Sequence, residues 1–254
     1  DGLNPTGTVK DRSAVTAVAA ALQFGYDRIG VVSTGNAATS IAAYAARAGI
    51  KAFVLSTESS SRPKVCHVNA LTANFAMYQG NYDDMIIGFD KAVNTKAIFD
   101  GGASRNPYKQ DGKKTMAYEI FEQMDLQVPD YVVYPVGIGE LLLACQRAFR
   151  ELKLAGHADR MPIPVAAQSD VADSIVKALD DEAERIPKSI TYTIAEGVAV
   201  GDMGAKGDWV LEDIRTSGGL GAASSDAEVI EWQQRLARLE GIWAGPTGCI
   251  TLPA

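Results

Sequence analysis

The chain has 254 residues, of which 47% are hydrophobic and 22% are charged, and its formal net charge is −7. This size and composition suit one large or two modest α/β domains, and the negative charge argues against a nucleic-acid-binding surface. No apolar run of membrane-spanning length and no signal peptide is found, which favours a cytoplasmic protein that uses no membrane. The three cysteines are far apart and the two histidines are not paired, so neither a disulfide framework nor a metal site is expected.

Short apolar strands alternate with amphipathic helices along much of the chain. In chain order, we expect strands at 28–33, 52–56, 75–79, 97–100, 130–136 and 163–168. The expected helices are 11–24, 37–48, 63–72, 83–95, 113–124 and 140–155. Beyond residue 168 the pattern loosens, and the prediction is strand and loop at 189–201, a helix at 226–240, and a strand entering a turn at 242–247. Such alternation is typical of parallel sheets with helices on both faces, where ligands gather at the carboxyl ends of strands.

The first expected helix opens with residues 4–12, Asn-Pro-Thr-Gly-Thr-Val-Lys-Asp-Arg. The proline and the glycine indicate a tight turn, and Thr8 is the expected N-cap. Lys10 then lies in the first helical turn, where the positive end of the helix dipole disfavours a charged amine. The position suits a lysine that becomes a neutral nucleophile, and the alternative is a surface lysine paired with Asp11.

Two further turns join an expected strand to an expected helix. Ser33-Thr34-Gly35-Asn36 is a candidate anion site at a helix N-terminus, or else an ordinary capped turn. Gly137-Ile138-Gly139-Glu140-Leu141 has the same character, although Glu140 would repel a bound anion unless its side chain turns away to solvent. A nicotinamide-binding fingerprint is incomplete here because Leu142 stands in place of its third glycine.

The lysine turn and the asparagine turn together resemble those of threonine synthases and threonine/serine dehydratases, which are fold type II (tryptophan-synthase-β-like) enzymes dependent on pyridoxal 5′-phosphate (PLP). The resemblance implies an α/β fold with two parallel-sheet, three-layer αβα domains. Residues 1–22 plus 112–254 would form the larger, PLP-binding domain, incomplete at both ends, and residues 23–111 the smaller one. It further implies a small amino-acid substrate and favours a homodimer.

The resemblance also assigns roles in the first half of the chain. Lys10 would be the catalytic Schiff-base lysine that carries PLP, and Asn36 would contact the 3′-oxygen of the cofactor. Lys109, in the segment Asn106–Thr115, would bind the substrate phosphate, and the alternative for that segment is a solvated basic loop. The substrate carboxylate would be bound by Ser33, Thr34, Gly35 and Asn36.

In the second half, the resemblance places the backbone of Gly197, within Thr193–Val200, beside the cofactor ring. The cup for the cofactor phosphate would consist of Gly137, Ile138, Gly139, Glu140 and Leu141. Ile138 and Glu140 depart from the glycine or asparagine that is usual there. The chain begins inside a motif and is interpreted as a fragment, so the partner of the pyridine nitrogen is expected beyond Ala254.

Three functions remain open at this point. A threonine synthase-like lyase, converting O-phosphohomoserine to threonine and phosphate, is favoured by Asn106–Thr115 and by Ser33–Gly49. A threonine/serine ammonia-lyase is favoured by Thr193–Val200. A non-catalytic relative with a degraded phosphate cup is suggested by Ile138 and Glu140.

Overall fold

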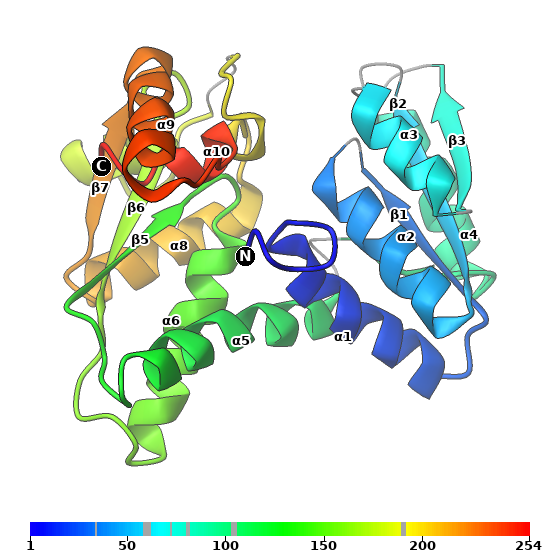
Figure 1. Cartoon of the computed structure of the whole chain (residues 1–254), viewed down its shortest axis with the longest axis horizontal. Helices are drawn as coiled ribbons and strands as arrows, with labels where there is room; N and C mark the ends of the chain where they lie inside the picture. The colour runs from blue at the N-terminus through cyan, green and yellow to red at the C-terminus, as the bar shows by residue number, and fades with distance from the viewer. Residues whose placement is uncertain (34, 58–61, 72, 80–81, 103–105, 189–191) are drawn as a thin grey trace. The chain divides into compact units, whose positions relative to one another are not determined.

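The structure is a computed structural model in which the chain divides into two compact units, Asp1–Lys113 and Lys114–Ala254 (Figure 1). We call them unit 1 and unit 2. The division falls inside helix α5 (Pro107–Gln123). The residues described are 1–33, 35–57, 62–71, 73–79, 82–102, 106–188 and 192–254.

Unit 1 is built on a parallel sheet that has four strands in the described part of the chain, in the order β3-β2-β1-β4. The strands are β1 (Arg28–Val32), β2 (Lys51–Thr57), β3 (Asn74–Tyr78) and β4 (Phe99–Asp100). Its helices before α5 are α1 (Lys10–Gln23), α2 (Asn36–Ala48), α3 (Arg62–Ala70) and α4 (Tyr82–Asn94). Ile29 and Val31 of β1 pack with Ile41 of α2 in a fully buried core, which fixes the start of α2 at the carboxyl end of β1.

Unit 2 has a second parallel sheet, with the described strands in the order β5-β6-β7. They are β5 (Tyr131–Pro135), β6 (Ile163–Ser169) and β7 (Leu220–Ser224). Its helices are α6 (Glu140–Leu154), α7 (Ser174–Asp180), η1 (Glu196–Val198), α8 (Gly204–Thr216), α9 (Asp226–Glu240) and α10 (Pro246–Cys249). The main core includes Leu142 and Phe149 of α6 and Val210 of α8, so these two helices share one buried layer.

The expected α/β class with parallel sheets is confirmed, and the strands and helices expected up to residue 168 are found with shifted ends. The largest shift is in α5, which begins at Pro107 and not at Lys113. Asn106 caps it, since its Oδ1 accepts a hydrogen bond from the Tyr108 amide at 3.0 Å, and proline suits the first helical position. The domain boundaries expected at 22/23 and 111/112 stay a prediction.

Two strand predictions in unit 2 are wrong. In the described part of 189–201 there is only η1, because Thr193 and Ile194 bind the Asp226 carboxylate of α9 (2.5 and 3.2 Å) and not a neighbouring strand. Residues 242–247 hold no strand either, since Pro246 starts the short helix α10. The helices α7 and α8 and the strand β7 were not predicted at all. None of the described helices combines the length and the apolar character that crossing a membrane requires.

Candidate active site

Lys10 is the first residue of α1, and a short hydrogen-bonded turn precedes it. The Lys10 amide donates to Thr8 Oγ1 at 2.9 Å, so Thr8 has the capping role expected of it. Asp11 is only 1% exposed, and its carboxylate accepts from the Thr6 amide at 2.7 Å and from Thr6 Oγ1 at 2.5 Å. Asp11 is therefore an internal anchor of the turn and not the surface partner that the alternative for Lys10 required.

Helix α2 lies against the lysine turn within unit 1. Thr6 Oγ1 is 3.1 Å from Ser40 Oγ on α2. Burial and the negative charge of Asp11 raise the pKa of the Tyr44 phenol, also on α2. These contacts bring the turn that carries Lys10 to the helix that begins with Asn36.

The asparagine turn leaves the carboxyl end of β1 and is held by hydroxyl groups. The Gly35 amide donates to Ser33 Oγ at 3.1 Å, and the buried Ser56 hydroxyl of β2 donates to the Ser33 carbonyl at 3.0 Å. Gly35 is the N-cap of α2, and among the described residues no atom lies within 4 Å of where its Cβ would stand. The first amides of α2 lack intrahelical acceptors and form an anion site at Asn36, whereas Thr34 lies outside the described residues.

Lys109 lies in the first turn of α5 and is only 3% exposed. Its Nζ donates to the Gly101 carbonyl at 2.7 Å, and the Gly101 amide donates to the Gly30 carbonyl of β1 at 2.7 Å. Because β4 pairs in parallel with β1, Gly101 and Ser33 leave the sheet at the same edge. The solvated-loop alternative for this segment is wrong, because the lysine is helical and buried at the edge where the asparagine turn lies.

In unit 2, residues 137–141 connect the carboxyl end of β5 to α6, with the half-buried Ile138 between two glycines. Gly139 is the N-cap of α6 with φ +84°, a conformation that L side chains rarely adopt. A Cβ on Gly137 would stand 2.7 Å from the Gly197 carbonyl oxygen, and one on Gly139 would stand 2.3 Å from Val210 Cγ2. Both positions require glycine, and the first-turn amides, including that of Leu141, lack intrahelical acceptors and form a candidate anion cup.

Gly197, in η1, is held against this cup and against α10. Its amide donates to Thr247 Oγ1 at 3.0 Å, and a Cβ on Gly197 would stand 2.7 Å from Thr247 Cγ2. The sequence assigned no role to Thr247, and no local signal could have done so because the two residues are 50 positions apart. The contacts bring together the cup, Gly197 and Thr247 within one unit.

Glu140, the first residue of α6, is not turned to solvent as we expected. Its side chain is 11% exposed, and its Oε1 accepts from Nζ of Lys206 on α8 at 2.5 Å. Lys206 was missed because it lies 66 positions along the chain, in a helix that the sequence pattern did not reveal. The carboxylate that placed the cup in doubt therefore has a cationic partner.

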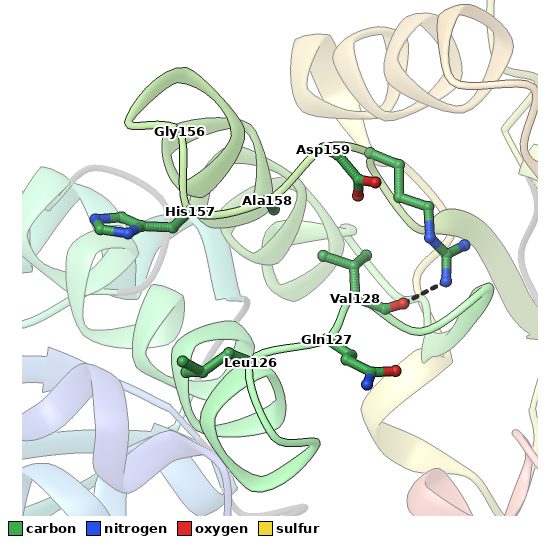
Figure 2. A pocket seen from close by; sticks show the side chains of 8 residues that line it. Leu126, Gln127, Val128, Gly156, His157, Ala158 and Asp159 are labelled. Atoms are coloured by element: carbon green, nitrogen blue, oxygen red, sulfur yellow. Dashed lines mark hydrogen bonds between the residues drawn. The ribbon is translucent and has the colours of Figure 1, made fainter.

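A separate cavity lies at the opposite edge of the unit 2 sheet (Figure 2). It is lined by residues 126–128 and 156–160, in the loops that precede β5 and β6. Arg160 in its wall binds the Val128 carbonyl at 2.5 Å and the Asp130 carboxylate at 2.6 Å. Ligands of parallel α/β sheets bind at carboxyl ends of strands, so the cup, and not this cavity, is the candidate site in unit 2.

Comparison with known proteins agrees with this geometry. The profile of the family described as "Pyridoxal-phosphate dependent enzyme" matches residues 1–254. The chain belongs to the pyridoxal-phosphate-dependent enzymes. It is 35% identical over 254 residues to threonine synthase of Methanocaldococcus jannaschii and 34% identical over 254 residues to that of Methanosarcina acetivorans. Each match covers 99% of this chain and 62% of the relative.

A solved crystal structure of a threonine deaminase from T.th. has a TM-score of 0.82 with this PLP enzyme chain, at 22% identity, covering 99% of this chain and 78% of the other. The likeness shows a shared fold. The fold type II assignment, the resemblance to threonine synthases and the PLP cofactor are confirmed.

The residues of this PLP enzyme chain fit the cofactor that its family uses. Gly137 and Gly139 keep the start of α6 free of side-chain atoms, as a phosphate bound to backbone amides requires. Lys10 is exposed at a helix start, where a neutral amine is favoured over a charged one. Lys10 belongs to unit 1 and the cup to unit 2.

Proposed function

We propose that the protein is a threonine synthase-like PLP enzyme that converts O-phosphohomoserine to threonine and phosphate. The observation that carries this proposal is the buried Lys109 ammonium, which lies at the same sheet edge as the Ser33–Asn36 turn. A fixed cation beside a carboxylate-binding turn suits a substrate with an amino-acid carboxylate at one end and a phosphate at the other. The identity to threonine synthases supports the same reaction, although the chain spans only 62% of those relatives.

Each residue of unit 1 then has a defined task. PLP, when bound, supplies an electron sink for the substrate carbon that loses a proton. Lys10 Nζ would hold the cofactor, release it to the substrate, and then take and return protons. The first amides of α2, with the Ser33 hydroxyl, would bind the substrate carboxylate, and Asn36 would contact the 3′-oxygen of PLP. Lys109 would hold the phosphate before and during its departure.

Unit 2 would anchor the cofactor without taking part in proton transfer. The amides from Gly137 to Leu141 would bind the PLP phosphate, which gains from the positive end of the α6 dipole. The backbone of Gly197 would lie beside the ring, held by the Thr247 hydroxyl. Because Glu140 is paired with Lys206, the net charge near the cup does not exclude a phosphate, which weakens the case for a non-catalytic relative.

A threonine/serine ammonia-lyase is the second candidate, favoured by the segment 193–200 around Gly197. Product analysis separates the two. We expect the full-length protein with PLP to release phosphate from O-phosphohomoserine faster than it releases a 2-oxo acid from threonine or serine. Release of 2-oxo acid alone would establish the second candidate and reject the first.

Substitution of Lys109 provides a sharper test. Lys109→Met is expected to raise KM for O-phosphohomoserine roughly tenfold or more, since a charge-assisted hydrogen bond is worth about 1.5–3 kcal/mol. Lys109→Arg retains the charge and is the matched control. Equal losses in both variants, or no loss in Lys109→Met, would contradict the phosphate role.

Attachment of PLP tests the role of Lys10. After borohydride reduction, peptide mapping is expected to find PLP on Lys10 in the wild type and no trapped PLP in Lys10→Ala. Label on another lysine would refute the assignment. The homodimer and the cytoplasmic location stay predictions, and size-exclusion chromatography of the full-length protein checks the first.

A further inference from the structure

The ion pair between Lys206 and Glu140 joins the first turns of two helices in unit 2. Glu140 begins α6, and Lys206 lies in the first turn of α8. Their side chains are 11% and 19% exposed, and Nζ and Oε1 are 2.5 Å apart. The pair is therefore largely shielded from water, unlike the Lys188–Asp202 pair of the same unit, whose side chains are 77% and 55% exposed.

Close packing of the two helices accounts for this contact. The missing Cβ of Gly139 lets Val210 of α8 approach the start of α6, since a Cβ there would stand 2.3 Å from Val210 Cγ2. Lys206 is four residues before Val210 and shares its face of α8. The lysine thus reaches the residue that follows Gly139, and the glycine that shapes the cup also admits the cation.

Stability alone gives little reason for a lysine at this position. The positive end of the α8 dipole disfavours a cation in the first turn. Removing both charges from water costs free energy that a single ion pair often fails to recover. Glu140, in contrast, carries a negative charge at the rim of a proposed phosphate site, where it would repel the ligand if it were unpaired.

We propose that Lys206 is a positioning residue for the cofactor phosphate, which acts by binding the Glu140 carboxylate and cancelling its charge beside the cup. The inference rests on the proposed PLP site in residues 137–141. It predicts that Lys206 matters for ligands that carry a phosphate and not for the rest of the cofactor. It also predicts that Lys206 becomes dispensable once Glu140 is neutral.

The experiment measures the dissociation constants of PLP and of pyridoxal, which lacks the phosphate, by absorbance titration of cofactor-free full-length protein. Lys206→Met is expected to weaken PLP binding roughly tenfold to a hundredfold and to leave pyridoxal binding unchanged, because one carboxylate then faces the phosphate without compensation. Lys206→Met combined with Glu140→Gln is expected to regain most of the wild-type PLP affinity. Lys206→Arg should retain it.

Lys188→Met is the matched control, since it removes the same charge from the exposed pair in the same unit and should leave the binding of both ligands unchanged. Circular dichroism checks that each variant is folded, and Lys206→Arg still tests the proposal if Lys206→Met does not fold. Equal affinity of wild type and Lys206→Met for PLP overturns the proposal, as does equal weakening of PLP and pyridoxal or failure of the double variant to recover. Absence of PLP binding to the wild type would instead reject the proposed function, and this inference with it.

Discussion

The buried carboxylate of Asp11 is expected to determine whether the lysine turn keeps its shape. Its oxygens accept from the Thr6 amide at 2.7 Å and from the Thr6 hydroxyl at 2.5 Å, and the same hydroxyl lies 3.1 Å from Ser40 Oγ on α2. Asp11→Ala removes both acceptors. The turn before Lys10 then loses its attachment to α1 and part of its attachment to α2.

The magnitude follows from these contacts. A hydrogen bond to a charged group contributes about 1.5–3 kcal/mol, so two of them set an upper value of about 6 kcal/mol. Thr6 is only half-buried, and water can replace part of what is lost, which reduces the expected destabilisation by Asp11→Ala to about 2–4 kcal/mol. In Asp11→Asn the amide can accept from the Thr6 N–H and donate to the hydroxyl. Both bonds remain without charge assistance, and the expected loss is about half as large.

Urea denaturation of the cofactor-free protein measures these differences, and borohydride trapping measures how much PLP Lys10 carries. We expect stability and trapped PLP to fall in the order wild type, Asp11→Asn, Asp11→Ala. Asp27→Asn is the control, because Asp27 is 71% exposed and paired at the surface with Arg28, so no measurable change is expected. A fully stable Asp11→Ala with unchanged trapping would refute the anchoring role.

Three further predictions concern other parts of the chain. Asn36→Ala is expected to shift the visible spectrum of the PLP-bound protein and to slow turnover roughly a hundredfold, and an unchanged spectrum and rate would leave the turn a simple helix cap. Thr247→Val removes the acceptor of the Gly197 amide, so it should cost about 1 kcal/mol in urea denaturation and alter the spectrum of bound PLP, whereas Thr247→Ser should do neither. The Tyr118 hydroxyl at 2.6 Å, followed by Lys114, holds the pKa of Glu151 below its usual value, a contribution to stability that is present at neutral pH and lost as acid protonates the carboxylate. Tyr118→Phe should therefore destabilise the protein at neutral pH, with a deficit that shrinks as the pH falls, and a deficit independent of pH would contradict this.

Local chemistry in the sequence was enough to predict much of this protein. The Pro-Thr-Gly-Thr-x-Lys turn, the Ser-x-Gly-Asn turn and the glycine pair at 137 and 139 each contain their structural cause in a few neighbouring residues. Helix α9 was predicted with its observed bounds, because Ser225 and Glu228 form a capping box and Gly241 ends the helix with φ +68°. The parallel sheets followed from the alternation of strand and helix patterns.

Contacts between distant segments were decided only by the tertiary structure. Lys206 meets Glu140 across 66 positions, and Thr247 meets Gly197 across 50. Neither pair leaves a local signal, since each depends on how closely two elements pack at a glycine. Lys109 is similar, because a lysine on a polar helix gives no sign that a neighbouring carbonyl group will bury its ammonium. Sequence motifs record the conformation of their own backbone, whereas the charge balance around a site depends on side chains that folding brings together.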